Sequence, residues 1–237
     1  MIKTTKIYFL ILSLFVLVCI AAGIVVKTSF KGYTQLTDLV KHENINSYSV
    51  QVMKVEESDD NDYFSEIDNF KELQEKSGLI LKVHVTNERT MYLQNTTKTK
   101  VVVKEIYKGS AKKGQEIYVY EPAVLSYSVS KSYDSIGGYQ LMKTNNDYYV
   151  FLQPLKVFKG YVKSAQENNT YLPSTIKYSV MRVNVGKQEI LNQKKLENGE
   201  YNYGDVLDQE IITDNKQELV KYQEIKKEFI NTYLKNN

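Results

Sequence analysis

The longest apolar run of the chain covers residues 7–26, and lysines lie on both sides of it. A helix rises about 1.5 Å per residue, so a run of this length reaches about 30 Å, the thickness of a bilayer's hydrocarbon core. The pattern predicts one N-terminal transmembrane helix after a cytoplasmic tail of residues 1–6. The flanking lysines favour neither orientation, but long domains translocate largely regardless of charge, so we expect the rest of the chain to be extracytoplasmic.

Two alternatives exist for this apolar segment. The small residues at 21–23 resemble a signal-peptide cleavage site, but the run continues through 24–26 and exceeds the usual apolar length of about 7 to 15 residues. Cys19 could be the lipidated cysteine of a lipoprotein, but Val-Leu-Val precedes it where such a signal has a small residue. We therefore expect an uncleaved membrane anchor.

In the residues after the anchor, some segments have the apolar spacing of a helix and others that of a strand. Residues 27–58 are expected to form a stalk, with a helix at 33–42 and a half-buried strand at 48–53, where apolar and polar side chains alternate. Residues 59–77 predict an amphipathic helix, because apolar residues recur at steps of three and four and aspartates crowd its start. Gly78 follows at the position of a left-handed C-cap.

From Leu79 the apolar period changes to two, which is typical of strands. We expect strands in these segments: 79–86, 90–94, 98–107, 116–121, 139–143, 147–153 and 176–185. The fifth and sixth of them are predicted to pair as a hairpin. Glycines bound a turn at 108–114, Pro122 ends a strand because it lacks a backbone donor, and a polar loop is expected at 126–135.

The C-terminal part is expected to be irregular at 191–208 and helical at 214–234. Asp214 and Gln217 have the spacing of an N-cap and its capping-box partner. The apolar face of this helix is expected to cover the domain's own core, and the alternative is that it docks a partner. The extracytoplasmic domain is thus residues 59–237, and its fold class is mainly β with flanking α-helices. Several strands joined by short turns predict a small barrel or sandwich.

The central third of the chain has the layout VVVKEIYKG, then KKGQEIYVYEP, then GGYQLMKTNNDYYVFL. This layout resembles the core of OB-fold barrels of the netrin-module and metalloproteinase-inhibitor type, and it is also similar to membrane-anchored surface proteins of low-GC Gram-positive bacteria. Over residues 79–155 the resemblance implies a small OB-like β-barrel after the N-terminal transmembrane helix. The netrin-type cysteines are absent, as is the N-terminal cysteine with which the inhibitors ligate a protease metal. The resemblance therefore implies the fold and not the inhibitory activity.

Charge and cysteine content narrow the partners and the compartment. The chain has 31 Lys+Arg and 28 Asp+Glu, and Lys3 and Lys6 precede the anchor, so the exterior part is nearly neutral. Nucleic acid binding needs clustered positive charge and is not expected. Cys19 is the only cysteine, so the exterior part can form no disulfide. The lack of disulfides, together with an amino-acid composition rich in Lys, Asn, Ile and Tyr, fits a protein of the Gram-positive cell surface.

Candidate catalytic and metal-binding patterns are sparse. His42 and His84 are far apart in the sequence and form no zinc motif. His84, on a strand's polar side, could pair with a carboxylate of a neighbouring strand, and the alternative is a solvated histidine. The acidic run at 56–62 lacks the glycine and bidentate glutamate of a calcium loop. No hydrolase or nucleotide signature occurs, so we expect no enzyme activity, cofactor or metal, although carboxylate pairs assembled by the fold stay open.

Tyrosine is abundant, with 20 residues in a chain of 237 that has no tryptophan. Tyr127, Tyr133 and Tyr139 cluster in and beside the polar loop and are the candidate ligand or partner contacts, since tyrosine combines a rigid ring with a hydrogen-bonding tip. The alternative is that tyrosines populate strand surfaces generally. The leading hypothesis is a cell-membrane protein whose exterior domain binds an envelope polymer or partner protein without catalysis. The alternatives are a surface enzyme with a carboxylate and tyrosine site, and a barrel that carries a small apolar ligand.

Overall fold

The computed structural model describes residues 12–20, 34–54, 67–92, 95–127 and 130–235. Two compact units are separated at Tyr33, and each is described by itself. In the first unit, residues 12–20 form a helix with exposed side chains. Among the described residues, no helix combines the length and the apolar character that crossing a bilayer requires. Most of the expected membrane span falls outside the described residues.

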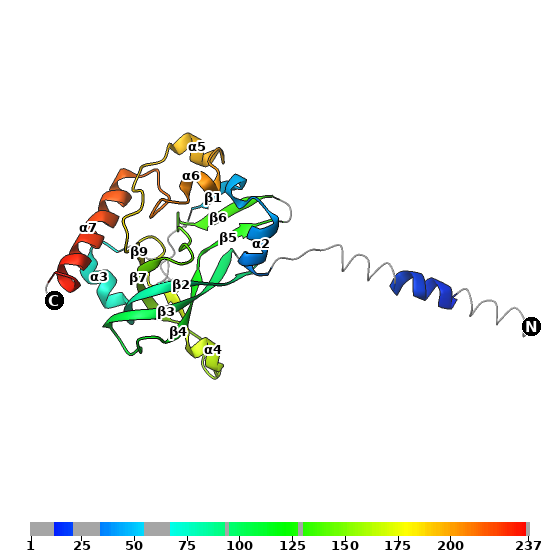
Figure 1. Cartoon of the computed structure of the whole chain (residues 1–237), viewed down its shortest axis with the longest axis horizontal. Coiled ribbons are helices and arrows are strands. Elements are labelled where there is room, and N and C mark those ends of the chain that lie inside the picture. The colour runs from blue at the N-terminus through cyan, green and yellow to red at the C-terminus, as the bar shows by residue number, and fades with distance from the viewer. Residues whose placement is uncertain (1–11, 21–33, 55–66, 93–94, 128–129, 236–237) are drawn as a thin grey trace, which may run out of the picture. The chain divides into compact units, whose positions relative to one another are not determined.

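The second unit begins at Thr34 and contains strands, short helices and one long C-terminal helix that lies at the edge of the unit (Figure 1). The helical elements are α2 (Leu36–His42), η1 (Ile45–Ser47), α3 (Phe70–Lys76), α4 (Ala165–Asn168), α5 (Gln193–Glu197), α6 (Tyr203–Val206) and α7 (Lys216–Tyr233). The strands are β1 (Ser49–Met53), β2 (Leu79–Tyr92), β3 (Thr96–Lys108), β4 (Glu116–Glu121), β5 (Ala123–Ser126), β6 (Ser132–Ile136), β7 (Asp147–Pro154), β8 (Thr170–Pro173) and β9 (Val180–Arg182).

The larger sheet has six strands in the order β2-β3-β4-β8-β7-β9, and β2 also pairs with β7. Strands β2, β3, β4, β8 and β7 therefore form a closed ring of pairings, in which β4 and β8 are parallel and the other neighbours antiparallel. Apolar side chains with no exposed surface line the strands of this ring: Leu81, Val83, Val85, Val101, Val103, Ile117, Val119, Val150 and Leu152. The two-residue period of the strands places them on one side of the sheet, where they exclude water.

A second sheet of three strands has the order β1-β6-β5. Pro122 separates β4 from β5, so the chain passes from the ring into this smaller sheet after one residue. Strand β6 pairs parallel with β1, with Ser49 opposite Ser132, and antiparallel with β5. The polar loop predicted at 126–135 is therefore wrong in part, because β6 occupies much of it. Serines are polar and are typical of loops, so Ser132 and Ser135 led to the loop prediction. Both are buried in the strand.

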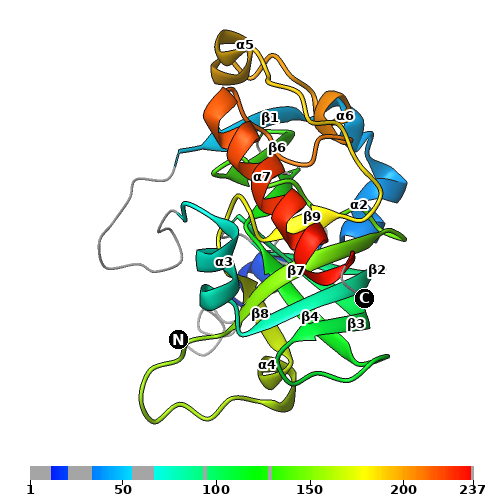
Figure 2. The same ribbon diagram turned by 90° about the vertical axis from the view of Figure 1, so that its left-hand side faces the viewer.

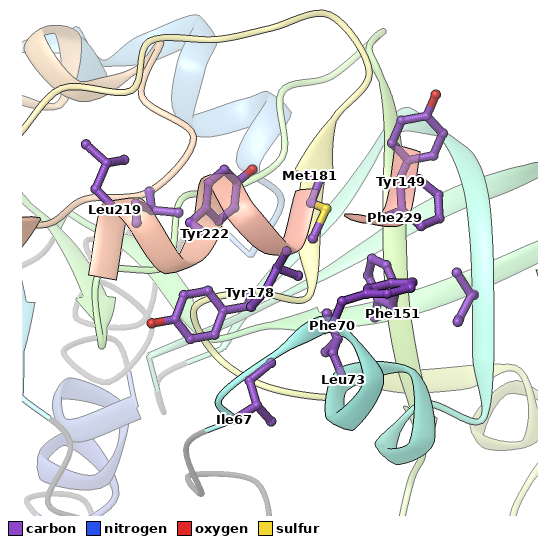
Figure 3. Close-up of a cluster of buried hydrophobic side chains, with 13 residues drawn as sticks. Ile67, Phe70, Leu73, Tyr149, Phe151, Tyr178, Met181, Leu219, Tyr222 and Phe229 are labelled. Carbon is purple, nitrogen blue, oxygen red and sulfur yellow. The ribbon is translucent and has the colours of Figure 1, made fainter. Parts of the chain in front are cut away.

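Helices α3 and α7 lie against the outer side of β2 and β7 and enclose an aromatic cluster (Figures 2 and 3). Phe229 of α7 has no exposed surface, and its ring lies 4.7 Å from Tyr149 and 5.4 Å from Phe151, measured between ring centroids. Phe70 of α3 meets Phe151 edge to face at 6.1 Å. The apolar face of α7 thus covers the protein's own core, as the sequence predicted. Residues on both sides of β7 are buried, which explains its nearly continuous apolar run.

Both amphipathic helices begin later than predicted. Helix α3 begins at Phe70, where the Asn69 side chain accepts a hydrogen bond from the Glu72 amide at 3.0 Å. The first residues of the predicted helix, including its acidic start, lie outside the described residues. The expected left-handed cap at Gly78 is wrong, because Ser77 already leads the chain in an extended conformation into β2. For α7 the N-cap is Asn215, one residue beyond the predicted Asp214.

Other boundaries differ because they depend on distant partners. Strand β2 is one strand of 14 residues where two were predicted, and register shifts let it bend around the ring. Residues 139–143 are not a strand, so the predicted hairpin is wrong and β7 pairs with β2 instead. Only Val180–Arg182 of the segment 176–185 is extended, as β9. The segment predicted as irregular, 191–208, contains the short helices α5 and α6.

Candidate functional site

A group of tyrosines and lysines covers the outer side of three neighbouring strands, β2, β3 and β4. This tyrosine face consists of Tyr92, Lys98, Lys100, Tyr118 and Tyr120. The pairing of β3 with β4 places Lys98 opposite Tyr120 and Lys100 opposite Tyr118. Directly opposed residues on one side of a sheet lie close enough for their side chains to touch. The face is therefore built by regular strands and not by loops.

The side chains of the tyrosine face are in mutual contact. The rings of Tyr92 and Tyr120 meet edge to face, with 5.9 Å between their centroids. The Lys98 ammonium lies 5.8 Å from the centre of the Tyr92 ring and 5.3 Å from that of Tyr118. Lys100 lies 6.0 Å from the Tyr118 ring. Tyr92 is 39% exposed and the others are half-buried, so the ring surfaces and the Lys98 charge are accessible to a ligand.

The two lysines of this face differ in their charge partners. Lys100 forms ion pairs of 2.9 Å with both Glu88 and Glu116. The hydrogen bonds that Lys100 donates to the carboxylates of Glu116 and Glu88 raise its pKa well above the ordinary value. Lys98 instead donates to the amide oxygen of Gln166 at 3.2 Å, and among the described residues it has no carboxylate partner. Lys98 is therefore the amine of this face that can meet an anionic ligand.

Chemically, the tyrosine face is suited to holding a ligand by its flat surface. Burial, and next the nearby Tyr92, raise the pKa of the Tyr120 hydroxyl, so that phenol stays protonated and can donate a hydrogen bond. Aromatic rings offer apolar area to the faces of sugar rings, while phenol and ammonium tips bind hydroxyl and acidic groups. The arrangement provides binding groups spread along a strand surface, as an extended polymer requires.

The tyrosines expected to contact a ligand lie elsewhere. Tyr133 has no exposed surface and Tyr139 only 3%, because β6 and the turn after it face the interior. The Tyr133 hydroxyl donates to the Tyr139 carbonyl at 2.8 Å and accepts from the Leu141 amide at 3.0 Å. Burial raises the pKa of Tyr133 well above its ordinary value. These two side chains hold the interior together, and their burial does not fit a role in ligand contact, whereas Tyr127 is half-buried.

The tyrosine face carried a signal in the sequence. In the segment EIYVYE, Ile117 and Val119 alternate with Tyr118 and Tyr120, and the first pair is fully buried. The same alternation puts the two tyrosines on the opposite side of β4. The sequence did not indicate that Tyr92 lies beside these two tyrosines. Tyr92 belongs to another strand, and only the pairing of strands decides which residues share a face of the sheet.

A buried ion pair that sequence reasoning missed lies at one end of the ring. Arg89 is 3% exposed and donates to Glu121, which is fully buried, at 2.8 Å. The Arg89 Nε also donates to the Thr99 hydroxyl at 3.0 Å. The other Glu121 oxygen accepts from the Met142 amide at 2.8 Å and from the Tyr139 hydroxyl at 3.2 Å. All these groups are committed to each other, which indicates a structural role.

His84 pairs with a carboxylate of a neighbouring strand, which was one of the two alternatives predicted for it. Its Nδ1 lies 2.7 Å from Asp147 Oδ1, because β2 and β7 place the two residues opposite each other. Both side chains are about one third exposed, so the pair sits on the open surface of the sheet. Within the described part of the chain, no group of three or more His, Cys, Asp or Glu residues could hold a metal ion.

A groove with a volume of about 490 Å³ lies between α2, β2 and α6. Its walls include Leu36, Val40 and Leu125, with Arg89 and Tyr203 among the polar residues that line it. Among the described residues that line it, none carries a carboxylate. The groove has the apolar walls of a small-molecule site.

Comparison with known proteins does not add to this geometry. A scan against protein-family models and a search of the curated proteins both find no match to this chain.

Proposed function

We propose that this chain is a single-pass membrane protein whose extracytoplasmic domain binds an envelope polymer through the tyrosine face. The observation that carries the proposal is the continuous set of Tyr92, Tyr118 and Tyr120 with Lys98 on the outer side of β2, β3 and β4. Such a surface binds repeating units without needing a deep pocket. A partner protein is the other ligand that this surface could take.

We further propose that the ring of strands is an OB-like barrel. The pairing order β2-β3-β4-β8-β7 with closure to β2 supports it, as does the one parallel pair between β4 and β8. OB folds are five-stranded Greek-key barrels whose second and third strands bind oligonucleotides and oligosaccharides. Those strands correspond to β3 and β4, which carry most of the tyrosine face. The small β1-β6-β5 sheet is an addition to the five-stranded core.

The membrane topology in this proposal rests on the sequence. Residues 7–26 are long and apolar enough to span a bilayer as a helix. The described unit from Thr34 onward has its own buried core, as a domain displayed outside a membrane needs. A protease-accessibility assay on intact cells tests the orientation: cleavage of the domain supports it, and full protection refutes it.

The polymer proposal is tested by co-sedimentation of the domain with insoluble envelope polymer. Replacing Tyr120 by alanine removes a ring that contacts Tyr92, and we expect binding to weaken about 2- to 13-fold, as for an aromatic contact of about 0.5–1.5 kcal/mol. Lys98→Gln should weaken binding chiefly at low salt, because its charge is screened at high salt. The matched control is Tyr127→Ala, which removes a half-buried tyrosine outside the face. Loss of binding in the control alone would favour the loop tyrosines and refute the face.

The groove beside α2 supports the small-ligand carrier as the second candidate. Leu36, Val40 and Leu125 give it apolar walls. By contrast, side chains without exposed surface occupy the inner side of the ring, which does not support a carrier that uses the barrel's lumen. Val40→Trp would fill part of the groove and should abolish uptake of a small apolar probe while leaving polymer binding intact.

A further inference from the structure

The connection between β7 and α4 exposes apolar side chains to an unusual extent. We call residues 155–164 the apolar loop; it extends from the body beside α4 (Figure 2). Val162 is 87% exposed and Phe158 is 76% exposed, while Val157 and Tyr161 are 42% and 41% exposed. Single exposed apolar residues are common on protein surfaces, but four within six consecutive positions form a patch, and patches mark interaction sites.

The apolar loop is held in place by specific contacts. The Tyr161 amide donates to the Phe158 carbonyl at 3.2 Å, across a turn in which Gly160 has a φ of +94°. The two rings contact each other with 5.3 Å between centroids. The Tyr161 hydroxyl donates to Glu167 of α4 at 2.6 Å. The turn therefore keeps the apolar side chains outward instead of letting them collapse onto the domain.

Charge in the apolar loop has one sign. Lys156, Lys159 and Lys163 alternate with the apolar residues, and no acidic residue occurs from Pro154 to Gln166. The first carboxylate after it, Glu167, accepts from the Tyr161 hydroxyl and from the Ser164 amide, at 2.6 and 2.7 Å. The loop thus combines exposed rings and branched aliphatic groups with a local positive charge.

We propose that the apolar loop seats on the surface of an anionic lipid bilayer. Phe158 and Val162 would enter the boundary between head groups and acyl chains, and Lys156 and Lys159 would meet lipid phosphates, whereas Lys163 donates to the Leu155 carbonyl within the loop. A bilayer fits both features, because it offers an apolar layer directly beneath a negative one. A second copy of the loop would bring like charges together, and lysine is depleted in protein–protein interfaces.

Binding of the apolar loop to the bilayer would also determine where the tyrosine face lies relative to the membrane. The loop leads into α4, and Gln166 of α4 accepts the hydrogen bond from Lys98 of that face. Contact of the loop with lipid would thus hold α4 and the adjoining edge of the tyrosine face close to the membrane surface. The inference concerns a different surface from the polymer site and does not depend on it.

The absence of tryptophan makes the proposal testable in the full chain. The variant F158W carries its only indole at the tip of the loop, and the matched control V185W carries it at another exposed position, 79% accessible, between β9 and α5. Both are reconstituted in vesicles of phosphatidylglycerol and phosphatidylcholine, with and without brominated acyl chains. We expect at least a threefold stronger quenching by brominated lipid in F158W than in V185W.

Lysine replacement separates charge from apolar insertion. Adding K156Q and K159Q to F158W should reduce the quenching at least twofold, and so should vesicles of phosphatidylcholine alone. Equal quenching of F158W and V185W, or none in F158W, overturns the proposal and leaves a protein as the occupant. A blue shift of the F158W emission that grows with protein concentration in neutral detergent also overturns it, since a second copy then covers the loop. Polymer binding should be unchanged by K156Q and K159Q, so the two proposals fail separately.

Discussion

Arg89 and Glu121 form an ion pair that water scarcely reaches, with side chains 4% and 0% exposed. Removing charges from water costs several kcal/mol per ion unless each is paired and its remaining polar atoms are bonded. Here the Thr99 hydroxyl, the Met142 amide and the Tyr139 hydroxyl complete the bonding. The network connects β2, β3 and β4 to the segment after β6.

Replacing Glu121 by alanine would leave the Arg89 charge buried without its partner. We expect the free energy of unfolding to fall by about 3–5 kcal/mol, measured by urea denaturation. The control is Glu105→Ala, which breaks the exposed 2.9 Å pair with Lys82 and should cost at most about 1 kcal/mol. Similar losses in both variants would show that water reaches the inner pair in solution.

At the scale of elements, α7 and α3 together cover the outer side of β2 and β7. The α7 residues Leu219, Tyr222, Ile225 and Phe229 are buried, whereas Val220 on the opposite side is 40% exposed. A second buried ion pair lies beneath this helix: Lys226 contacts Glu210 at 2.6 Å, and Glu210 also accepts from the Gly186 amide at 2.8 Å. The helix is thus fixed by aromatic packing and by charge.

Phe229→Ala would open a cavity among the rings that enclose it. We expect a loss of about 3–5 kcal/mol in the free energy of unfolding, from the lost burial and the residual cavity. Val220→Ala on the same helix should change stability by at most about 0.5 kcal/mol, because it affects surface away from the core. Thermal unfolding followed by circular dichroism compares the two variants, and equal midpoints would contradict the assignment of α7 to the core.

At the scale of the whole molecule, the compact unit begins at Thr34, before α2. The Thr34 carbonyl accepts from the Met91 amide at 2.8 Å, and the Gln35 side chain donates to Thr90 at 3.0 Å. Leu39 is fully buried and Leu36 nearly so. Helix α2, predicted as part of a stalk, is therefore built into the domain.

A chain that begins at Thr34 should fold, whereas one that begins at Glu43 should be less stable by about 3–6 kcal/mol, since it loses two buried leucines worth about 1.5–3 kcal/mol each. Urea denaturation of the two truncated chains measures the difference. Equal stability would mean that α2 is a detachable stalk after all, as the sequence first suggested.

Hydrophobic periodicity alone determined the mainly β class, the core strands and the C-terminal helix. Buried and less buried residues alternate throughout β4 and over the first eight residues of β3, and the apolar residues of α7 recur at helical spacing, so local physics was sufficient there. The separation of Tyr118 and Tyr120 from the buried Ile117 and Val119 also followed from this alternation.

Only the tertiary structure decided which distant segments meet. Closure of the ring through β2 and β7, the parallel pairing of β1 with β6, and the joining of Tyr92 to Tyr120 all depend on contacts far apart in the sequence. The same holds for the burial of Tyr133, whose side chain is amphipathic and tolerates either environment. A residue's own chemistry determines what it can do, but its neighbours across the sheet determine whether it faces solvent, and those neighbours are set by strand pairing and not by local pattern.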